Sequence, residues 1–349
     1  MGANRADPGK VGGTDIHPNR RQPVTGLRLP ARDEVTVQFA HSAYRLAERF
    51  EARGTGVRHF QTWTLDDTLA RVGEADVLVI SGFWRNEMQE RAKRLAYIQS
   101  IGAGYDQFPL DDLRARGIPL ANASGVNRDA VAQHGMALIL ALARHLPQAR
   151  DNQRARVWRG MISSLAERED ELSGHTLVVL GLGAIGSQLA RIAKACGMLV
   201  IGLKRDTAKH DGVADEVLPP DRLLDVLPRA DFVALCCPLT AATRSIIDAA
   251  ALAAMRPSCY LVNIARGGCV DEPALLEALR RKGIAGAAID HFWDEPLPPE
   301  SPFWDLDNVF ITPHTGGETR KYEDRVTGVV AENLERLWAG RDDLENRIV

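Results

Sequence analysis

Short apolar runs and helically spaced apolar residues alternate along most of the chain. The clearest example spans residues 177–205, where an apolar run at 177–180 precedes a helically spaced segment and a second apolar run at 199–203. Such runs are typical of buried strands, and the wider spacing is typical of a helix with one apolar face. Gly197 would end that helix. The stretch therefore predicts a strand, a helix and a second strand in succession.

The same alternation recurs on both sides of this stretch. On its N-terminal side, the pattern predicts strands at 35–39, 76–80 and 97–100 and helices at 42–52, 87–94 and 110–116. On its C-terminal side, it predicts strands at 232–236, 260–264, 285–290 and 309–312 and helices at 273–282 and 318–338. Strands that alternate with helices indicate parallel α/β sheets.

Two further segments differ from this alternation. Residues 127–146 form a long stretch rich in alanine and leucine that is apolar around most of a helical circumference. Such a helix is buried, either between domains or against a partner subunit. Residues 1–32 are rich in Gly, Pro, Arg, Asn and Asp without periodicity. This composition predicts a disordered tail.

The composition narrows the class of protein. A length of 349 residues favours two domains, each with its own core. A net charge of −3 without a basic block gives no reason to expect nucleic acid or an acidic membrane as a partner. No apolar run approaches the ~20 residues of a membrane helix. The five cysteines lie mostly within apolar patterns and lack metal-binding spacing, which predicts a reduced, cytoplasmic protein without a metal site.

A glycine motif lies between the first strand and the helix of the 177–205 stretch. Gly181, Gly183 and Gly186 follow the G-x-G-x-x-G pattern. In such a turn the first glycine makes the bend, the second lets the backbone approach a pyrophosphate, and the third allows the helix to pack on the strand. The free amides at the start of the helix would meet the phosphate charge. The motif predicts a dinucleotide-binding site.

Three charged or titratable residues follow predicted strands, where ligands of parallel sheets bind. Arg266 follows the strand at 260–264 and precedes two glycines. Its guanidinium suits bidentate capture of a carboxylate, although a surface arginine on a loop is the alternative. His314 follows the strand at 309–312, and Glu295 lies five residues after Asp290. A histidine can transfer a proton during reduction or oxidation of an alcohol, and a carboxylate beside it would favour the imidazolium.

The other histidines and one small-residue loop are less informative. We interpret His41, His59, His134, His145 and His210 as structural or exposed residues. His291, next to Asp290, is the further histidine most suited to line a site. The loop at 100–106 contains small residues whose amides could approach an anion, and an ordinary β-turn explains the loop equally well.

The motifs together resemble the D-isomer-specific 2-hydroxyacid dehydrogenase family. They occur in the order SIGAGYD, NASGVNRDAVAQHGMALILALAR, VVLGLGAIG, CPLTAATRSII, LVNIARGG, AIDHFWDEPLP and ITPHTGG. The resemblance covers nearly all of the chain after the tail. It implies an enzyme, an NAD(P)-dependent oxidoreductase that transfers a hydride between a 2-oxo acid and a (R)-2-hydroxy acid. A dinucleotide-sensing, dimeric corepressor is the alternative within the same family.

The resemblance also implies roles for the residues at the strand ends. Arg266 would hold the substrate carboxylate and polarise the carbonyl, His314 would be the general acid–base, and Glu295 would hold and tune it. The amides of Ala103 and Gly104 would help to bind the substrate carboxylate. The cofactor would contact the residues of the glycine turn together with Ala184, Ile185, Pro238, Thr243, Ile264, Asp290 and His314.

The family's architecture implies two Rossmann-like domains with parallel sheets and a cleft between them. A discontinuous, flavodoxin-like substrate domain would comprise 33–124 plus 318–349, and the dinucleotide-binding domain would comprise 125–317. A hinge would close the cleft and exclude water. Members of the family are usually homodimers built around the long helix, which agrees with the apolar character of 127–146.

The sequence departs from NAD-preferring relatives at Lys204, where those relatives carry an acidic residue that binds the ribose 2′-hydroxyl. Lys204 and Arg205 would instead attract a 2′-phosphate, although Asp206 lies close by. We therefore expect NADP rather than NAD. For the substrate, Phe83 and Trp84 could contact an apolar side chain or belong to the core. Glyoxylate, hydroxypyruvate, phenylpyruvate and branched 2-oxo acids all remain open.

Overall fold

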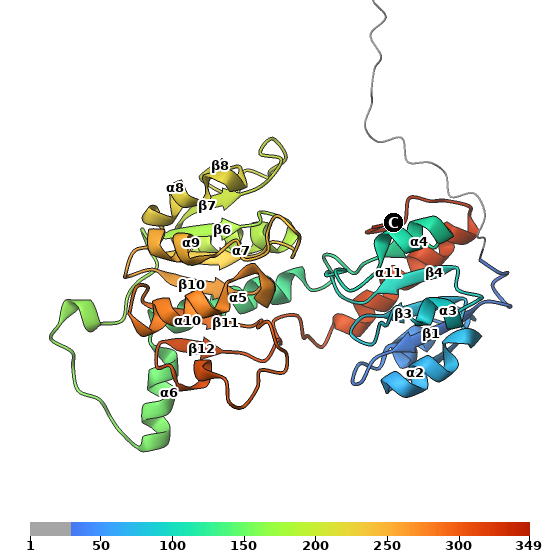
Figure 1. Ribbon diagram of the computed structural model, residues 1–349, viewed down its shortest axis with the longest axis horizontal. Helices are drawn as coiled ribbons and strands as arrows, with labels where there is room; N and C mark the ends of the chain where they lie inside the picture. The colour runs from blue at the N-terminus through green and yellow to red at the C-terminus, as the bar shows by residue number, and fades with distance from the viewer. Residues whose placement is uncertain (1–28) are drawn as a thin grey trace, which may run out of the picture.

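Two parallel sheets organise the protein, and they lie in separate halves of the molecule (Figure 1). The computed structural model describes residues 29–349. Of the predicted tail at 1–32, residues 1–28 lie outside the described residues. Residues 29–32 contact the C-terminal helix, where the Trp338 indole N–H donates to the carbonyl of Pro30 at 2.9 Å.

The first sheet has the order β2-β1-β3-β4-β5. Its strands are β1 (Thr36–Ala40), β2 (Arg58–Thr62), β3 (Val77–Ile80), β4 (Tyr97–Ser100) and β5 (Leu120–Ala121). Five helices pack with it, namely α1 (Leu46–Glu51), α2 (Leu65–Arg71), α3 (Met88–Arg91), α4 (Leu110–Arg116) and α11 (Tyr322–Trp338). This strand order is that of the flavodoxin-like fold.

Alternate residues of the first sheet enter two different cores. In β3, Val77 and Val79 face the core that contains α1 and α11, whereas Leu78 and Ile80 face the core on the opposite side. A parallel sheet that is covered on both faces needs apolar residues at every position, which explains the continuous apolar run.

The second sheet has the order β12-β11-β10-β9-β6-β7-β8. Its strands are β6 (Thr176–Leu180), β7 (Leu199–Leu203), β8 (Glu216–Leu218), β9 (Phe232–Leu235), β10 (Tyr260–Asn263), β11 (Gly286–Ile289) and β12 (Val309–Ile311). The strand order reverses between β6 and β9, as in doubly wound dinucleotide-binding folds. The predicted fold class, two Rossmann-like α/β sheets, is confirmed.

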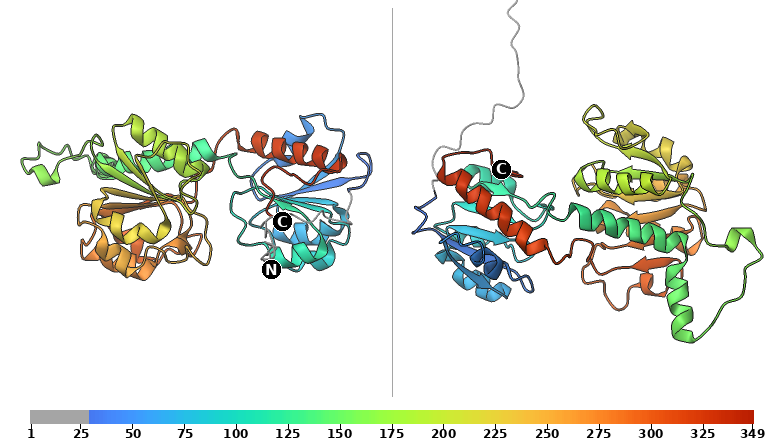
Figure 2. Two further views of the ribbon diagram at one scale, coloured as in Figure 1. Left: turned by 90° about the horizontal axis from the view of Figure 1, so that it is seen from above. Right: turned by 180° about the vertical axis from the view of Figure 1, so that it is seen from behind.

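Helices cover both faces of the second sheet (Figure 2). On one face lie α5 (Arg128–Ala143) and α7 (Ala184–Ala195), and on the other lie α8 (Leu223–Val226), α9 (Ala249–Ala254) and α10 (Glu272–Arg280). Short 3₁₀ helices occur at Val72–Glu74, Leu165–Glu167, Pro220–Arg222, Leu227–Arg229, Gly267–Cys269 and Pro302–Asp305. Of the helices in the described range 29–349, none is both long and apolar enough to cross a bilayer.

The C-terminal helix α11 returns to the first sheet after the second sheet is complete. Its Asn333 is fully buried, donates from Nδ2 to the hydroxyl of Tyr97 at 2.9 Å and accepts from the backbone N–H of Glu345 at 2.7 Å. The Tyr322 hydroxyl donates to the carbonyl of Ile101 beyond β4. Because buried polar groups are costly when unpaired, these bonds fix α11 in one position on the sheet.

Several elements were not predicted from the sequence. The structure adds β2, α2, β5, β8, α6 (Leu146–Ala155), α8 and α9, and the helix predicted at 127–146 corresponds to α5, which ends at Ala143. Helix α6 contains no buried residue and projects from the body of the molecule (Figure 2). It has no apolar stripe because it packs against no sheet, so hydrophobic periodicity gives no signal for it.

Candidate active site

The glycine turn between β6 and α7 lies at the point where the strand order of the second sheet reverses. Gly181 has φ +101°, and a Cβ at this position would lie 2.7 Å from the Cα of Cys237 after β9. A Cβ at Gly186 would lie 2.2 Å from the carbonyl oxygen of Gly181. Gly183 faces open space beside Ala184 and Ile185, the first residues of α7. The uncovered helix start at the switch point fits a pyrophosphate.

A cavity of about 460 Å³ opens beside this turn and is strongly basic. Lys204 lines it and donates from Nζ to the carbonyl of Leu182 at 3.0 Å. Arg205 is exposed and lies outside the lining, and Asp206 pairs with Lys209 at 3.1 Å. The cavity is lined by Arg128, Leu182, Gly183, Ala184, Ser187, Arg191, Lys204, Lys209, His210 and Asp211. Its cationic groups outnumber its acidic one, so it fits the phosphates of a dinucleotide.

The remaining predicted cofactor residues lie along the C-terminal strand ends of the second sheet. After β9, the Thr243 hydroxyl donates to the carbonyl of Pro238 at 2.6 Å, which fixes the loop. Ile264 follows β10 and is buried against α5, where a Cβ on Gly135 would lie 2.7 Å from its Cδ1. In the structure Ile264 therefore belongs to the core of the second sheet.

Arg266 extends from the second sheet to the loop after β4 of the first. A Cβ on Gly104 would lie 2.0 Å from Nη2 of Arg266, so the guanidinium lies directly against this loop. The carboxylate of Asp106 lies 3.9 Å from Nε of Arg266. Asn122 holds the same loop by donating to the carbonyl of Ala103 at 2.6 Å. The structure thus brings the predicted carboxylate-binding residues together across the two sheets.

The loop that carries Arg266 also packs on the segment that carries Glu295. A Cβ on Gly267 would lie 2.0 Å from the carbonyl carbon of Phe292, so the two backbones touch. The Phe292 N–H in turn donates to Oε1 of Glu295 at 3.1 Å. Close backbone packing of this kind requires glycine and fixes Arg266 relative to the carboxylate.

His314 and Glu295 form a hydrogen-bonded pair. Nδ1 of His314 lies 2.6 Å from Oε2 of Glu295. Both side chains are partly exposed, at 49% and 36%. Within the described part of the chain, Nε2 of His314 makes no hydrogen bond. This leaves one imidazole nitrogen tied to a carboxylate and the other available to a ligand, as expected of a general acid–base.

The charge of Glu295 is stabilised by its neighbours. Burial by itself would raise the pKa of this carboxyl, but the imidazole of His291 at 3.4 Å and the hydrogen bond with His314 outweigh burial. The pKa of Glu295 therefore lies well below its usual range. The group therefore remains a carboxylate at neutral and mildly acidic pH.

Asp290 controls the turn that carries His314. Asp290 is 2% exposed. Its carboxylate accepts the Thr312 hydroxyl at 2.6 Å and the backbone N–H groups of Thr315 and Gly316 at 3.0 and 3.1 Å. His314, in the middle of this turn, has φ +54°, a conformation that few residues other than glycine adopt. The carboxylate thus holds the histidine in an unfavourable backbone conformation.

Two histidines contribute more than the sequence indicated. The ring of His291 lies 3.8 Å from that of His314, and its Nδ1 lies 3.4 Å from Oε1 of Glu295. Burial, followed by the nearby positive charges of His314 and Arg266, lowers the pKa of His291 despite its carboxylate neighbours. His134, which we interpreted as structural, lies 3.4 Å from Asp290. No local pattern marks His134, because its partner comes from a distant strand.

Trp84 does not line the site. It is 4% exposed and packs on Phe108 with a ring separation of 5.1 Å in the core of the first sheet. Phe83 packs against the same core. Of the two interpretations given for Trp84, core packing is therefore the one that the structure supports. The presence of a tryptophan at this position gives no information about the substrate.

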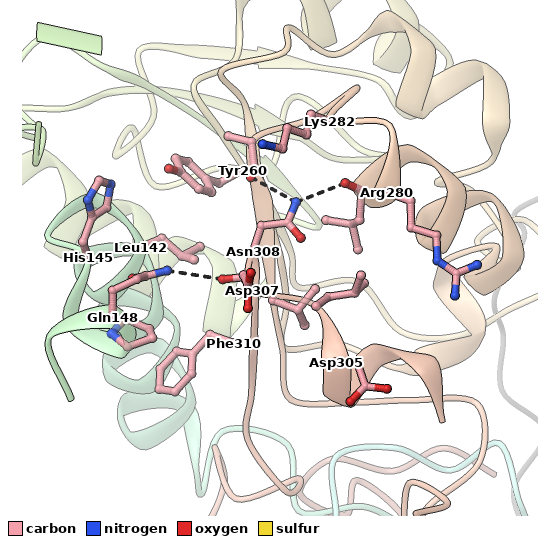
Figure 3. Close-up of a pocket in the computed structure, with 15 residues that line it drawn as sticks. Leu142, His145, Gln148, Tyr260, Arg280, Lys282, Asp305, Asp307, Asn308 and Phe310 are labelled. Atoms are coloured by element: carbon pink, nitrogen blue, oxygen red, sulfur yellow. Dashed lines mark hydrogen bonds between the residues drawn. The ribbon is translucent and has the colours of Figure 1, made fainter. Parts of the chain in front are cut away.

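A second cavity, of about 490 Å³, lies at the N-terminal ends of the strands of the second sheet (Figure 3). Tyr260 and Val309, which begin β10 and β12, line it together with His145 and Gln148 from the start of α6. Gln148 donates to the carbonyl of Asp307 at 3.3 Å across this cavity. Because it lies at the N-terminal strand ends, this cavity is separate from the Arg266 and His314 site.

The strand order, the glycine turn and the cluster of Arg266, Glu295 and His314 together define a dinucleotide-binding α/β protein with an acid–base site at its carboxyl strand ends. The model of the D-isomer specific 2-hydroxyacid dehydrogenase NAD binding domain matches residues 136–316. The chain belongs to this family, as its motifs predicted.

Known proteins of similar sequence and structure agree with this assignment. D-3-phosphoglycerate dehydrogenase of Methanocaldococcus jannaschii is 37% identical over 279 residues, which are 79% of this chain and 52% of that protein. The chain thus spans about half the length of these dehydrogenases. Glyoxylate reductase of Pyrococcus furiosus is 36% identical over 273 residues, 76% of this chain and 80% of that protein.

Solved structures of similar architecture include a glyoxylate/hydroxypyruvate reductase. This NADPH-dependent enzyme from Sinorhizobium meliloti, in complex with NADP and malonate, has a TM-score of 0.76 and 26% identity and covers 90% of this chain and 97% of its own. The TT0316 protein of Thermus thermophilus has a TM-score of 0.77 and 32% identity over 90% of this chain and all of its own.

The Asp290 carboxylate makes stability depend on pH. Burial opposes its charge, but hydrogen bonds from His134 and Thr312, the charge of His291 and the Gly316 amide hold its pKa below its ordinary value. The carboxylate therefore stabilises the fold above the unfolded pKa of about 3.9, and this contribution is lost as the pH falls toward the folded pKa. We expect Asp290→Asn to lower the free energy of unfolding at neutral pH. Between about pH 5 and pH 3, the free energy of unfolding should fall less steeply in the variant than in the unmodified protein.

Urea unfolding of both proteins across this pH range measures the effect. Glu295, whose pKa is also lowered, is present in both proteins. The difference between the two pH profiles therefore reports on Asp290 alone. Parallel profiles would contradict the assignment.

Proposed function

We propose that the chain is an oxidoreductase that interconverts a 2-oxo acid and a (R)-2-hydroxy acid by hydride transfer with NAD(P). The observation that carries this proposal is the convergence of Arg266, Glu295 and His314 at the carboxyl strand ends, beside the glycine turn. Such a site needs a carboxylate-binding cation, a proton donor and a dinucleotide groove, and the described residues supply all three.

Each residue has a chemical task in this proposal. The guanidinium of Arg266 binds the substrate carboxylate with the amides of Ala103 and Gly104 and polarises the carbonyl. The bound cofactor supplies the hydride for reduction and accepts it in the reverse direction. His314 donates a proton from Nε2 to the carbonyl oxygen and takes it back in the reverse direction. Glu295 remains ionised and stabilises the imidazolium.

The two halves of the molecule would then have separate tasks. Residues 33–124 plus 318–349 form the substrate domain, which agrees with the packing of α11 on the first sheet. Residues 125–317 form the dinucleotide-binding domain around the second sheet. The side chain of Arg266 reaches Gly104 and so connects the two halves. A hinge motion about this contact would exclude water from the reacting atoms.

A homodimer is the second part of the proposal, and an exposed apolar arm supports it. After α6, Trp158 and Met161 are 99% and 100% exposed, and Leu165 is 79% exposed. This arm extends away from the second sheet (Figure 2). A second copy of the chain would cover these side chains, since exposed apolar groups of this size mark interaction surfaces.

The names of similar proteins narrow the substrate. Glyoxylate reductases and a glyoxylate/hydroxypyruvate reductase resemble this chain over most of their own lengths. Small 2-oxo acids of this kind are therefore the first to be assayed. A screen of 2-oxo acids with NADPH and NADH, followed at the absorbance of the reduced nicotinamide, tests the proposed function. Absence of turnover with every acid and both cofactors would contradict it.

NADP is the proposed cofactor because Lys204 lines a basic cavity beside the glycine turn, with Arg205 next to it in sequence. We expect a higher kcat/KM with NADPH than with NADH. Lys204→Glu should reduce the ratio of kcat/KM with NADPH to kcat/KM with NADH by at least ~10-fold, since a hydrogen bond to a charged group contributes about 1.5–3 kcal/mol. Arg222→Glu, an exposed site with the same change of charge, is the control. A preference for NADH in the unmodified protein would overturn this choice.

Replacement of the acid–base group should separate chemistry from binding. His314→Gln keeps a polar side chain but has no titratable proton, so turnover should fall ~10²–10⁴-fold. Cofactor affinity, measured by quenching of protein fluorescence, should change little. His41→Gln, in the first sheet's half of the molecule, serves as the control. Undiminished turnover in the His314 variant would exclude it as the proton donor.

Replacement of the carboxylate-binding group should act on the 2-oxo acid. Arg266→Lys keeps the charge but loses the planar fork of donors. We expect kcat/KM for the 2-oxo acid to fall by at least ~10-fold, equivalent to about 1.4 kcal/mol, while the KM for the cofactor is retained. Arg256→Lys, at an ion pair with Asp231 outside the site, is the matched control. Steady-state kinetics that matched those of the control would refute this role.

A further inference from the structure

His291 presents a buried nitrogen without a hydrogen-bond partner. The residue is 5% exposed, and its Nδ1 is completely buried and makes no hydrogen bond in the described part of the chain. A buried polar atom without a partner is costly to the fold. The nitrogen is directed toward Glu295, whose Oε1 lies 3.4 Å away. The fold therefore holds a potential ligand atom at the acid–base site.

The three side chains His291, Glu295 and His314 can each offer one ligand atom, and these atoms all lie within 4.8 Å of one another. Zn²⁺ binds His nitrogen at about 2.0–2.1 Å and carboxylate oxygen at about 2.0–2.2 Å, so tetrahedral ligands lie about 3.4 Å apart. Nδ1 of His291 lies 3.4 Å from Oε1 of Glu295, which equals this value, and Nδ1 of His314 lies 2.6 Å from Oε2, the other oxygen of the same carboxylate. A bound metal would replace the direct hydrogen bond between His314 and Glu295.

We propose that His291, Glu295 and His314 form a binding site for a divalent transition metal, best matched by Zn²⁺, which blocks the acid–base pair when it is bound. Two imidazoles and one carboxylate are a donor set that suits Zn²⁺, Ni²⁺ and Co²⁺. A fourth position remains open to water because His314 and Glu295 face solvent. The site is accessible from the side on which the substrate would enter.

Asp290 supports the site as a second carboxylate. It lies 3.7 Å from Nε2 of His291, on the side of the ring opposite Nδ1. A carboxylate in this place favours the tautomer that carries its proton on Nε2 and leaves Nδ1 free to bind a metal.

Metal binding and the proposed catalysis require the same atoms. In the pair, Nδ1 of His314 bonds to Glu295, and the metal would take both atoms. His314 would then be fixed by the metal instead of the carboxylate and could no longer act with it as an acid–base pair. Bound Zn²⁺ would therefore inhibit turnover. This consequence rests on the proposed function, whereas the binding itself does not.

Titration of the chelator-treated, full-length chain with Co²⁺ alone tests the binding. We expect one Co²⁺ per chain, seen by visible ligand-field absorption, and its displacement by Zn²⁺. His291→Gln and His314→Gln should each weaken Co²⁺ binding by at least ~10-fold, because even outer-shell changes cost metal sites 10–100-fold. His41→Gln, in the first sheet's half of the molecule and outside the cluster, should bind as the unmodified protein does.

The outcomes separate the metal site from the dehydrogenase proposal. Equal Co²⁺ affinity in both cluster variants, or no stoichiometric binding by the unmodified chain, would overturn the site whatever the enzyme activity. Thermal unfolding shows whether His291→Gln, a change at a buried residue, still folds. If it does not fold, Co²⁺ binding by His314→Gln alone tests the site. Bound Zn²⁺ without loss of turnover would overturn the inhibitory role. Loss of Co²⁺ binding in both cluster variants and of Zn²⁺ inhibition in His291→Gln, with retention of both in His41→Gln, would support it.

Discussion

The hydrogen bonds of the Asp290 carboxylate determine where the acid–base histidine lies. This buried group follows β11 and accepts the Thr312 hydroxyl and two backbone amides from the turn after β12. Since a buried carboxylate is tolerated only when it is well paired, the turn has one low-energy conformation. His314 is held within it at positive φ, with its Nδ1 directed toward Glu295. Every chemical role assigned to this site depends on that orientation.

Close packing of backbone on backbone assembles the remainder of the site. Glycine at 267 lets the Arg266 loop touch Phe292, and glycine at 104 lets the guanidinium touch the loop after β4. Glycine at 181 brings the dinucleotide turn against the loop after β9. At each place a Cβ would occupy space that belongs to a neighbour. The strand ends therefore converge because the loops after them lack side chains where they meet.

The electrostatics of the site follow from the same arrangement. Glu295 is surrounded by two imidazoles, so its negative charge is stabilised, whereas His291 is buried near other positive groups and tends to remain neutral. One carboxylate between two histidines of different character suits both a proton-transfer pair and a metal ligand set. The basic cavity at Lys204 lies apart from this cluster and is formed by a different set of side chains. Binding of dinucleotide phosphate and proton transfer thus use separate charges.

By itself, the sequence determined the class of fold, the family and the residues most suited to chemistry. Apolar runs mark strands such as 177–180 and 77–80, because burial on both faces of a parallel sheet favours them. The glycine motif and the residues after the strands mark the groove and the acid–base site. Edge strand β2 and projecting helix α6 gave no signal, because neither is buried on both sides.

Only the tertiary structure decided which of these residues meet. In the folded chain His134 lies near Asp290, Trp84 is buried in the core, and the ring of His291 packs against that of His314. The tertiary structure also showed that Arg266 extends from one sheet to a loop of the other. These contacts link residues that are far apart in the chain or that differ only in orientation. Local periodicity reports burial and backbone shape, whereas pairing and direction arise when separate strands pack at one edge.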